Sequence, residues 1–107
     1  MTLIAHVRAQ ITAGAYAEPD PEAAAKLEAR RHWRTIVREV ADKHGLTPDE
    51  LLRPSAKHKI AHPRQEAMFR ARHETPLSLP EIGRRLGGLH HSTVIHGVRA
   101  YAKRAGA

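Results

Sequence analysis

Apolar residues recur every three or four positions along most of this 107-residue chain, which is the spacing of amphipathic α-helices. The longest pattern begins after Asp20-Pro21, a pair typical of a helix N-terminus, and stops at Lys43-His44-Gly45. Its inward positions are Leu27, Trp33, Ile36, Val37, Val40 and Ala41. The pattern predicts a long scaffold helix. Because no segment alternates with the period of a β-strand, the expected fold class is all-α.

A shorter pattern lies near the N-terminus. Four apolar residues there share one helical side and are followed by Gly14; they are Leu3, Ile4, Val7 and Ile11. They predict an amphipathic helix of about ten residues, joined to Pro21 by a linker. Its polar face holds few cations, which argues against a membrane surface. We expect the stripe to pack on the domain or on a second copy, which would make a homodimer.

The middle of the chain is punctuated by prolines. Thr47-Pro48-Asp49-Glu50 has the spacing of a capping box and predicts a short helix that Pro54 stops. Residues 53–62 have little apolar patterning, and we expect a basic loop there; its basic residues include Lys57, His58 and Lys59. Pro63 is expected to open another helix, with Met68 and Ala71 facing inward. Three of its arginines are expected to be available to solvent or phosphate: Arg64, Arg70 and Arg72.

Two further helices are predicted at the C-terminus. Ser78-Leu79-Pro80-Glu81 is a second capping box, and the helix it starts ends at Gly87-Gly88, a pair that permits a sharp turn. The last helix carries the clearest apolar stripe of the chain, formed by Val94, Ile95, Val98, Tyr101 and Ala102. A short helix, a glycine turn and a second helix are the parts of a helix-turn-helix.

The charge of the chain is concentrated in its C-terminal half. Up to Leu52 there are 7 basic and 8 acidic residues, whereas 11 basic and 3 acidic residues follow it, so the two parts carry −1 and +8. Such segregation is typical of a surface that neutralises phosphates. If the stripe of the last helix faces the core, an outward set remains near its N-terminus: His91, Ser92, Thr93, His96 and Arg99. These side chains can contact base edges and phosphates, and the free amides of the first turn can bind phosphate oxygens.

Three segments together resemble a known family. They are His62-Pro63-Arg64-Gln65-Glu66-Ala67-Met68, Ser78-Leu79-Pro80-Glu81-Ile82-Gly83, and the run from Gly87 to His96. In order and spacing they are similar to the C-terminal DNA-binding domain of the bacterial chromosomal replication initiator DnaA. The resemblance covers roughly residues 30–104. It implies a helical domain that recognises a short duplex box, with a helix in the major groove and a basic loop reaching the minor groove.

The resemblance also implies roles for particular residues. Arg64 and Gln65 match a pair that holds the DNA backbone, and Leu79 and Pro80 begin the helix that braces the recognition helix. The remaining matches form the reading set: His91, Ser92 and Thr93 match the family's His-Thr-Thr triplet, and His96 matches a histidine one turn onward.

Two departures from the family pattern stand out. Leu89-His90 replaces an Arg-Asp pair, so an acceptor that can select cytosine is lost; we expect His90 to contact the DNA, but not in the same way. The minor-groove arginine falls at Ala56, so that contact would have to come from Lys57, His58 or Lys59. The pattern therefore predicts DNA binding more firmly than it predicts the initiator's own box.

Several other classes of function find little support. The sequence has no cysteine and no glycine-rich phosphate loop ending in Gly-Lys-Ser/Thr, and no apolar run approaches the roughly 20 residues of a membrane span. Only His58 and His62 have the i, i+4 spacing of a metal pair, and no third ligand is near them in sequence. Glu81 beside His91 could be imagined as the acid and base of a nuclease, but Glu81 is better explained as a capping residue.

The sequence therefore predicts two parts: an N-terminal helix and linker over 1–20, and a helix-turn-helix domain over 21–107. We expect a free-standing, cytoplasmic and nucleoid-associated protein that binds double-stranded DNA sequence-specifically, regulates replication initiation or transcription, and is not an enzyme. No cofactor, metal, nucleotide or membrane is expected to take part. The alternative is a protein-interaction module that uses the N-terminal helix, with incidental basicity.

Overall fold

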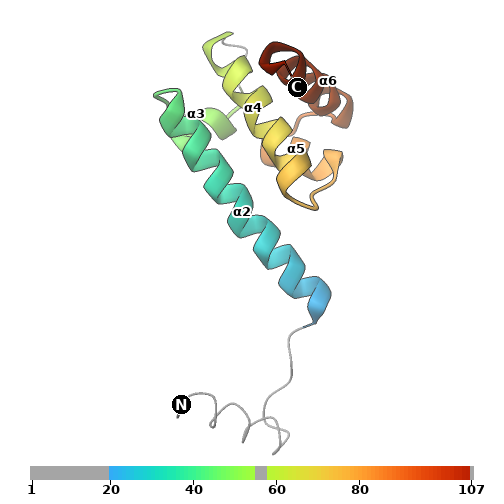
Figure 1. Cartoon of the computed structure of the whole chain (residues 1–107). Helices are drawn as coiled ribbons and strands as arrows, with labels where there is room; N and C mark the ends of the chain where they lie inside the picture. Colours follow the sequence, from blue (N-terminus) through green and yellow to red (C-terminus); the bar gives the residue numbers. More distant parts are fainter. Residues whose placement is uncertain (1–19, 55–57, 107) are drawn as a thin grey trace, which may run out of the picture.

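Helices account for nearly all of the described structure. The computed structural model describes residues 20–54 and 58–106, and in these two ranges the chain forms α-helices and no strand, which confirms the all-α class (Figure 1). The helices are α2 (Pro21–Lys43), α3 (Pro48–Leu52), α4 (His58–Glu74), α5 (Leu79–Arg85) and α6 (His91–Ala105). The predicted N-terminal helix, the homodimer through it, and Lys57 lie outside the described residues.

The long helix α2 begins where the sequence predicts. The Asp20 side chain accepts a hydrogen bond from the Glu22 amide at 3.2 Å, and Pro21 occupies the first helical position. Residues 21–28 are all exposed, and burial begins at Ala29. The expectation that Leu27 faces the core is wrong: its exposed fraction is 45%, because the first turns of α2 extend past the other helices (Figure 1).

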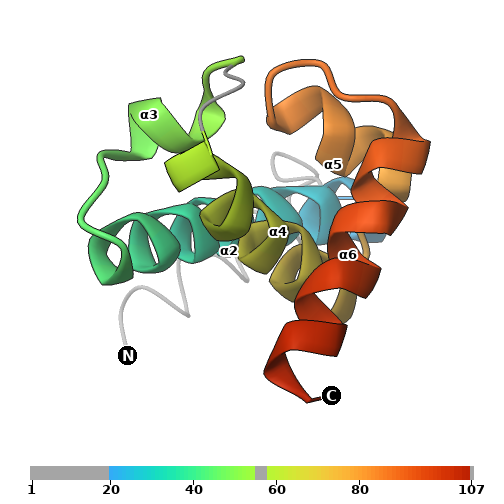
Figure 2. The ribbon, with the colours of Figure 1, turned by 90° about the horizontal axis from the view of Figure 1, so that it is seen from above.

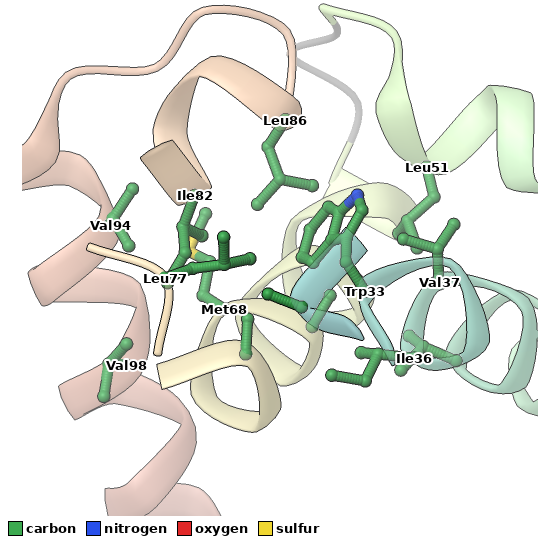
Figure 3. Packing of buried hydrophobic residues seen from close by; sticks show 14 residues of the cluster. Trp33, Ile36, Val37, Leu51, Met68, Leu77, Ile82, Leu86, Val94 and Val98 are labelled. Carbon is green, nitrogen blue, oxygen red and sulfur yellow. The ribbon is translucent and has the colours of Figure 1, made fainter. Parts of the chain in front are cut away.

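A single apolar core joins the five helices. Ile36, Leu51, Ile82 and Val94, which come from four different helices, have no exposed surface, nor has Leu86 just after α5, and Trp33 is 4% exposed (Figure 3). The interpretation of Trp33 as a core residue is therefore confirmed. Met68 and Ala71 of α4 are also buried, as predicted. Of the predicted stripe of α6, Val94 and Val98 belong to this core, whereas Ile95, Tyr101 and Ala102 are only half-buried. The side of α6 opposite Val94 and Val98 is left to solvent.

Helix α4 starts earlier than the sequence predicts. It begins at His58 and contains Pro63, so the expected loop over residues 53–62 is wrong in its second half, and Pro63 does not open the helix. Pro63 lacks the amide that would bond the carbonyl four residues back, which costs one helical hydrogen bond. Ile60 is 4% exposed and lies one turn from buried Arg64, so core packing stabilises the turn that precedes the proline.

Helix α4 lies at the centre of the domain, between α2 and α6 (Figure 2). Gly97 of α6 allows a close approach here, because a Cβ at this position would strike the sulfur of Met68. Helix α5 packs against both α4 and α6. This arrangement fixes α6 along one side of the domain.

The turn between α5 and α6 is built on glycine. The carbonyl oxygen of Gly83 accepts hydrogen bonds from the amides of Gly88 at 3.1 Å and Leu89 at 2.8 Å. A Cβ on Gly83 would collide with the backbone carbonyl of Leu89, and Gly87 and Gly88 both have left-handed backbone conformations, with φ of 84° and 79°. The predicted sharp turn into the last helix is therefore confirmed.

Candidate nucleic-acid interface

The first turn of α6 presents polar side chains to solvent. His91, Ser92 and Thr93 are exposed, whereas Val94, the next residue, is completely buried. One turn further on, His96 and Arg99 are exposed as well. All five residues that the sequence predicts to face outward on α6 therefore do so.

The start of α6 is capped by His90. Its Nδ1 accepts a hydrogen bond from the Ser92 amide at 3.2 Å and lies 2.7 Å from the Ser92 hydroxyl oxygen. An unprotonated Nδ1 satisfies both contacts, and the ring proton is then carried by Nε2. His90 thus acts as an N-cap, a role usually taken by Asp or Asn, and the sequence did not predict it.

Fewer amides are available to a phosphate here than the sequence predicts. The Ser92 amide is taken by His90, and the Thr93 amide donates to the His90 carbonyl oxygen at 3.0 Å. The rings of His90 and His91 lie with their centroids 4.1 Å apart. In the first turn of α6, the groups available to a ligand are therefore mainly side chains, and the backbone amides contribute less.

A groove runs between α6 and α4. It has a volume of about 360 Å³, and Thr93 and His96 form part of one wall while Gln65 forms part of the other. Its full lining is Ala61, Arg64, Gln65, Met68, Leu89, Thr93, His96, Gly97 and Ala100. The fold therefore brings together four residues that the sequence predicts to bind DNA: Arg64, Gln65, Thr93 and His96.

Arg64 and Gln65 differ from the expectation in how they are held. Arg64 is 5% exposed, its Nε donates to the Leu51 carbonyl oxygen at 3.0 Å, and burial lowers the pKa of its guanidinium. The expectation that Arg64 is openly available to solvent is therefore wrong, because α4 turns this side chain toward α3. Gln65 is half-buried, and its amide oxygen accepts a hydrogen bond from Arg104 of α6.

The remaining predicted residues lie around the two helices of the motif. Leu79 is half-buried and Pro80 is exposed in the first turn of α5, where Ser78 and Glu81 form the predicted capping box. The two backbone hydrogen bonds of this box are both 3.3 Å long. The one that the Ser78 amide donates to the Glu81 carboxylate, followed by one from the Ser78 hydroxyl at 3.0 Å, lowers the pKa of Glu81. The interpretation of Glu81 as a capping residue is confirmed.

The basic residues before Pro63 are only partly described. Lys59 is exposed on the first turn of α4. His58 is the first residue of that helix, and Lys57 lies outside the described residues. These cations therefore belong to the start of a helix at least in part, whereas the sequence predicts a loop.

Acidic residues of α4 are engaged by cations at its contact with α2. Glu66 is 6% exposed; although burial alone would raise its pKa, hydrogen bonds from His44 and Lys43, each 3.1 Å long, lower it. Arg70 donates to Glu74 at 2.7 Å and to Glu39 at 2.9 Å.

These contacts set the charges of Arg70 and Glu74. The carboxylates raise the pKa of Arg70, while the hydrogen bond from Arg70, followed by one from His32, lowers the pKa of Glu74 to about 2. Arg70, expected to be available to phosphate, is instead occupied by carboxylates. The i, i+4 spacing of Arg70 and Glu74 was the one signal in the sequence for this contact.

The described residues show no grouping of His, Asp or Glu side chains that could hold a metal ion. None of the described helices is both long and apolar enough to cross a bilayer.

The glycine turn between α5 and α6, with the exposed first turn of α6, defines the class of this domain as a helix-turn-helix. A family model described as "Bacterial dnaA protein helix-turn-helix" matches residues 33–100. The chain belongs to this family of DNA-binding domains of the replication initiator.

Individual relatives agree with this assignment. The chain is 48% identical over 64 residues to the chromosomal replication initiator protein DnaA of Cereibacter sphaeroides, and 45% identical over 64 residues to that of Thermus thermophilus. With the protein of the same name from Brucella abortus, the identity is 46% over 72 residues. The matches cover 60%, 60% and 67% of this chain, but only 14%, 15% and 14% of the relatives. No solved structure matches the chain.

Proposed function

We propose that this protein binds double-stranded DNA sequence-specifically, with α6 in the major groove. The observation that carries the proposal is the exposure of His91, Ser92 and Thr93 on a helix whose opposite side is anchored in the core. The N-terminal residues of a recognition helix contact base edges in helix-turn-helix complexes. Membership of the initiator's helix-turn-helix family supports the same placement.

Within this proposal, Thr93 and His91 read base edges. A threonine can donate or accept a hydrogen bond and can place its methyl group against that of thymine, and an imidazole can donate to a guanine acceptor. The Ser92 hydroxyl, when it donates to His90, keeps its lone pairs for a base donor. His90 itself stabilises the first turn of α6 as its N-cap. Its remaining ring donor, Nε2–H, is on the other side of the ring from the Nδ1 that accepts the Ser92 amide.

A second set of residues contacts the DNA backbone. His96 and Arg99 continue the exposed side of α6, while Lys57, His58 and Lys59 supply cations from the region before Pro63. Leu79 and Pro80 place the first turn of α5 beside the backbone. On binding DNA, the Gln65 side chain exchanges its hydrogen bond from Arg104 for a contact with a phosphate. Arg64 supports the wall of the groove between α4 and α6. We expect these contacts to be largely independent of sequence.

We assign this binding unit to residues 21–107 and place its action in replication initiation or transcription at the nucleoid. The contacts require no nucleotide, because every group in them is a side chain or amide of the chain itself. The chain spans about 14% of the length of the initiators it matches, and the activities of those whole proteins are not part of this proposal.

The proposal is tested by selecting bound duplexes from a random pool with the full chain and sequencing them. A single enriched consensus, bound with an affinity that falls steeply as salt rises, is the expected result. A consensus like the initiator's box would point to replication, and an unrelated one to regulation. Recovery of no consensus, or binding that ignores salt, would contradict the proposal.

A further inference from the structure

Three arginines form a row along α2 that the helix-turn-helix does not include. Arg30, Arg34 and Arg38 follow each other at intervals of four residues and are all exposed. Residues four apart lie on neighbouring turns, so the three side chains project from one slowly turning strip of the helix. Four residues rise about 6 Å, and the row is about 12 Å long.

The row is distinguished from the other cations of α2 by its lack of acidic partners. Lys26 lies 3.9 Å from Glu22, Arg31 lies 3.6 Å from Glu28, and Lys43 is bound to Glu66. Within the described ranges, no hydrogen bond or ion pair holds the side chain of any arginine of the row. Half of the cations on α2 are therefore neutralised within the fold, and the other half share one strip.

The row lies on the side of α2 that faces α3 and α5. Arg34 and Arg38 line a depression together with Pro48 and Leu52, at the contact with α3. Arg30 lines a cavity of about 550 Å³ together with Arg85, near the end of α5. The acids of that cavity are already used, because Glu22 pairs with Lys26 and Glu81 caps α5. The other side of α2, which carries His32, Glu39 and Lys43, contacts α4.

Helix α5 connects this row to the proposed binding surface. The first helix of a helix-turn-helix crosses the DNA backbone, and α5 carries Arg84 and Arg85 in its last turn. Arg30 continues this cationic surface onto α2, and Arg34 and Arg38 extend it further along the helix. The phosphates of one DNA strand advance about 3.4 Å each along the duplex axis, so a row of about 12 Å matches three or four of them.

We propose that Arg30, Arg34 and Arg38 bind the phosphate backbone of the duplex that flanks the site read by α6. The guanidinium group suits this ligand, because its planar fork of donors can bind two phosphate oxygens. The row adds affinity on longer DNA and carries no sequence information, since it contacts phosphates alone.

The inference rests on the proposed function, and its test separates the two. The selected consensus is placed in a short duplex of about 12 base pairs and in a longer one of about 40 base pairs, at one protein per duplex. The double variant Arg34→Gln/Arg38→Gln is compared with Lys26→Gln/Arg31→Gln, a control that removes the same charge from the same helix. Circular dichroism melting confirms that each variant is folded.

On the longer duplex, the slope of log affinity against log salt is expected to fall by about 1.8 for Arg34→Gln/Arg38→Gln, because two phosphate contacts are lost. On the short duplex the slope should stay at its wild-type value. The control should keep most of its slope on both, and Arg34→Lys/Arg38→Lys should keep most of the slope on the longer one.

Three results would overturn the inference while leaving sequence-specific binding intact. They are a wild-type slope for Arg34→Gln/Arg38→Gln on the longer duplex, an equal fall on both duplexes, and an equal fall in the control. The first result would assign the row to another partner, such as an acidic protein surface. If the wild-type chain binds neither duplex, the proposed function itself fails.

Discussion

Between α2 and α4, basic side chains face acidic ones, whereas in the described part of the chain no ion pair holds the cations and imidazoles that α6 presents to solvent. Glu66 of α4 binds Lys43 and His44 at the end of α2, and Arg70 of α4 binds Glu39 of α2 as well as Glu74 of its own helix. Helix α6 contains no acidic residue, and its imidazoles and Arg99 point to solvent. The same residue types therefore join helices in one region and stay available for a partner in the other.

The difference depends on where three carboxylates are placed. Only Glu66, Glu74 and Glu81 follow Leu52, and each has a partner inside the domain. Glu81 caps the start of α5, and among the described residues none of the three carboxylates pairs with a side chain of α6. The excess of positive charge after Leu52 thus remains on exposed side chains such as Arg99, because the three carboxylates have partners elsewhere in the domain.

The glycine turn is the feature that separates the two regions, and its loss should have the largest effect. In Gly83→Ala the new Cβ would collide with the Leu89 carbonyl, a backbone atom that cannot move without displacing α6. We expect a loss of more than about 3 kcal/mol in the free energy of unfolding, measured by urea denaturation. Gly88→Ala is the control, because nothing lies within 4 Å of its Cβ and only its positive φ is strained. Equal losses from the two variants would contradict the role given to Gly83.

The second-largest effect is expected from Glu66, the buried carboxylate of α4. Glu66→Gln removes the charge that Lys43 and His44 face, and we expect a loss of about 2 kcal/mol in the free energy of unfolding. DNA affinity of the folded variant should be unchanged, since this contact joins α2 to α4 away from α6. A variant that keeps its stability but loses DNA binding would break the comparison between the two regions.

The third effect concerns Glu74, the more exposed acid at the contact between α2 and α4. We expect its ion pair to make the stability of the protein depend on pH. The pKa of Glu74 is about 2 in the folded protein, below the ordinary value of 4.5 for a glutamate, so its contribution to stability is present above about pH 4.5 and is lost as pH falls toward 2. Because Glu74 is partly exposed, solvent screening limits the contribution to about 1 kcal/mol. Melting curves of wild type and Glu74→Gln should converge as the pH is lowered through this window. A constant difference between them would be inconsistent with the ion pair.

The smallest expected effect concerns the cap of α6. His90→Ala removes the acceptor of the Ser92 amide and should cost about 0.5–1 kcal/mol of unfolding free energy in thermal melts at neutral pH. His90→Asn keeps a side-chain acceptor and should restore most of that loss. If His90→Asn is as unstable as His90→Ala, the imidazole does not act as a cap.

Local signals in the sequence predicted the helices and their ends well. The capping boxes at Thr47 and Ser78, the glycines between α5 and α6, and the burial of Val94 and Val98 in α6 depend on residues at most a few positions apart. Such features can be read from a single chain because their geometry is fixed by the backbone. The exposure of the residues on α6 followed from the same helical periodicity.

The features that the sequence did not predict depend on contacts between distant segments. The exposed position of Leu27 depends on how far α2 extends past the core, and the burial of Arg64 depends on the carbonyl of Leu51 in another helix. The start of α4 at His58 was missed because Pro63 is a strong local signal for a helix start, whereas the packing of Ile60 is a tertiary effect. The pairing of Arg70 with Glu39 likewise joins residues 31 positions apart.

The central claim is that the first turn of α6 reads base edges, and Thr93→Ala tests it most directly. Its affinity is measured on the selected duplex and on a scrambled duplex of equal length, beside Thr35→Ala of α2 as a matched control. Thr93→Ala should lose about 1–3 kcal/mol of binding free energy on the selected duplex and almost none on the scrambled one, while Thr35→Ala changes neither. Equal losses for Thr93→Ala on the two duplexes, or no loss on either, would contradict the account.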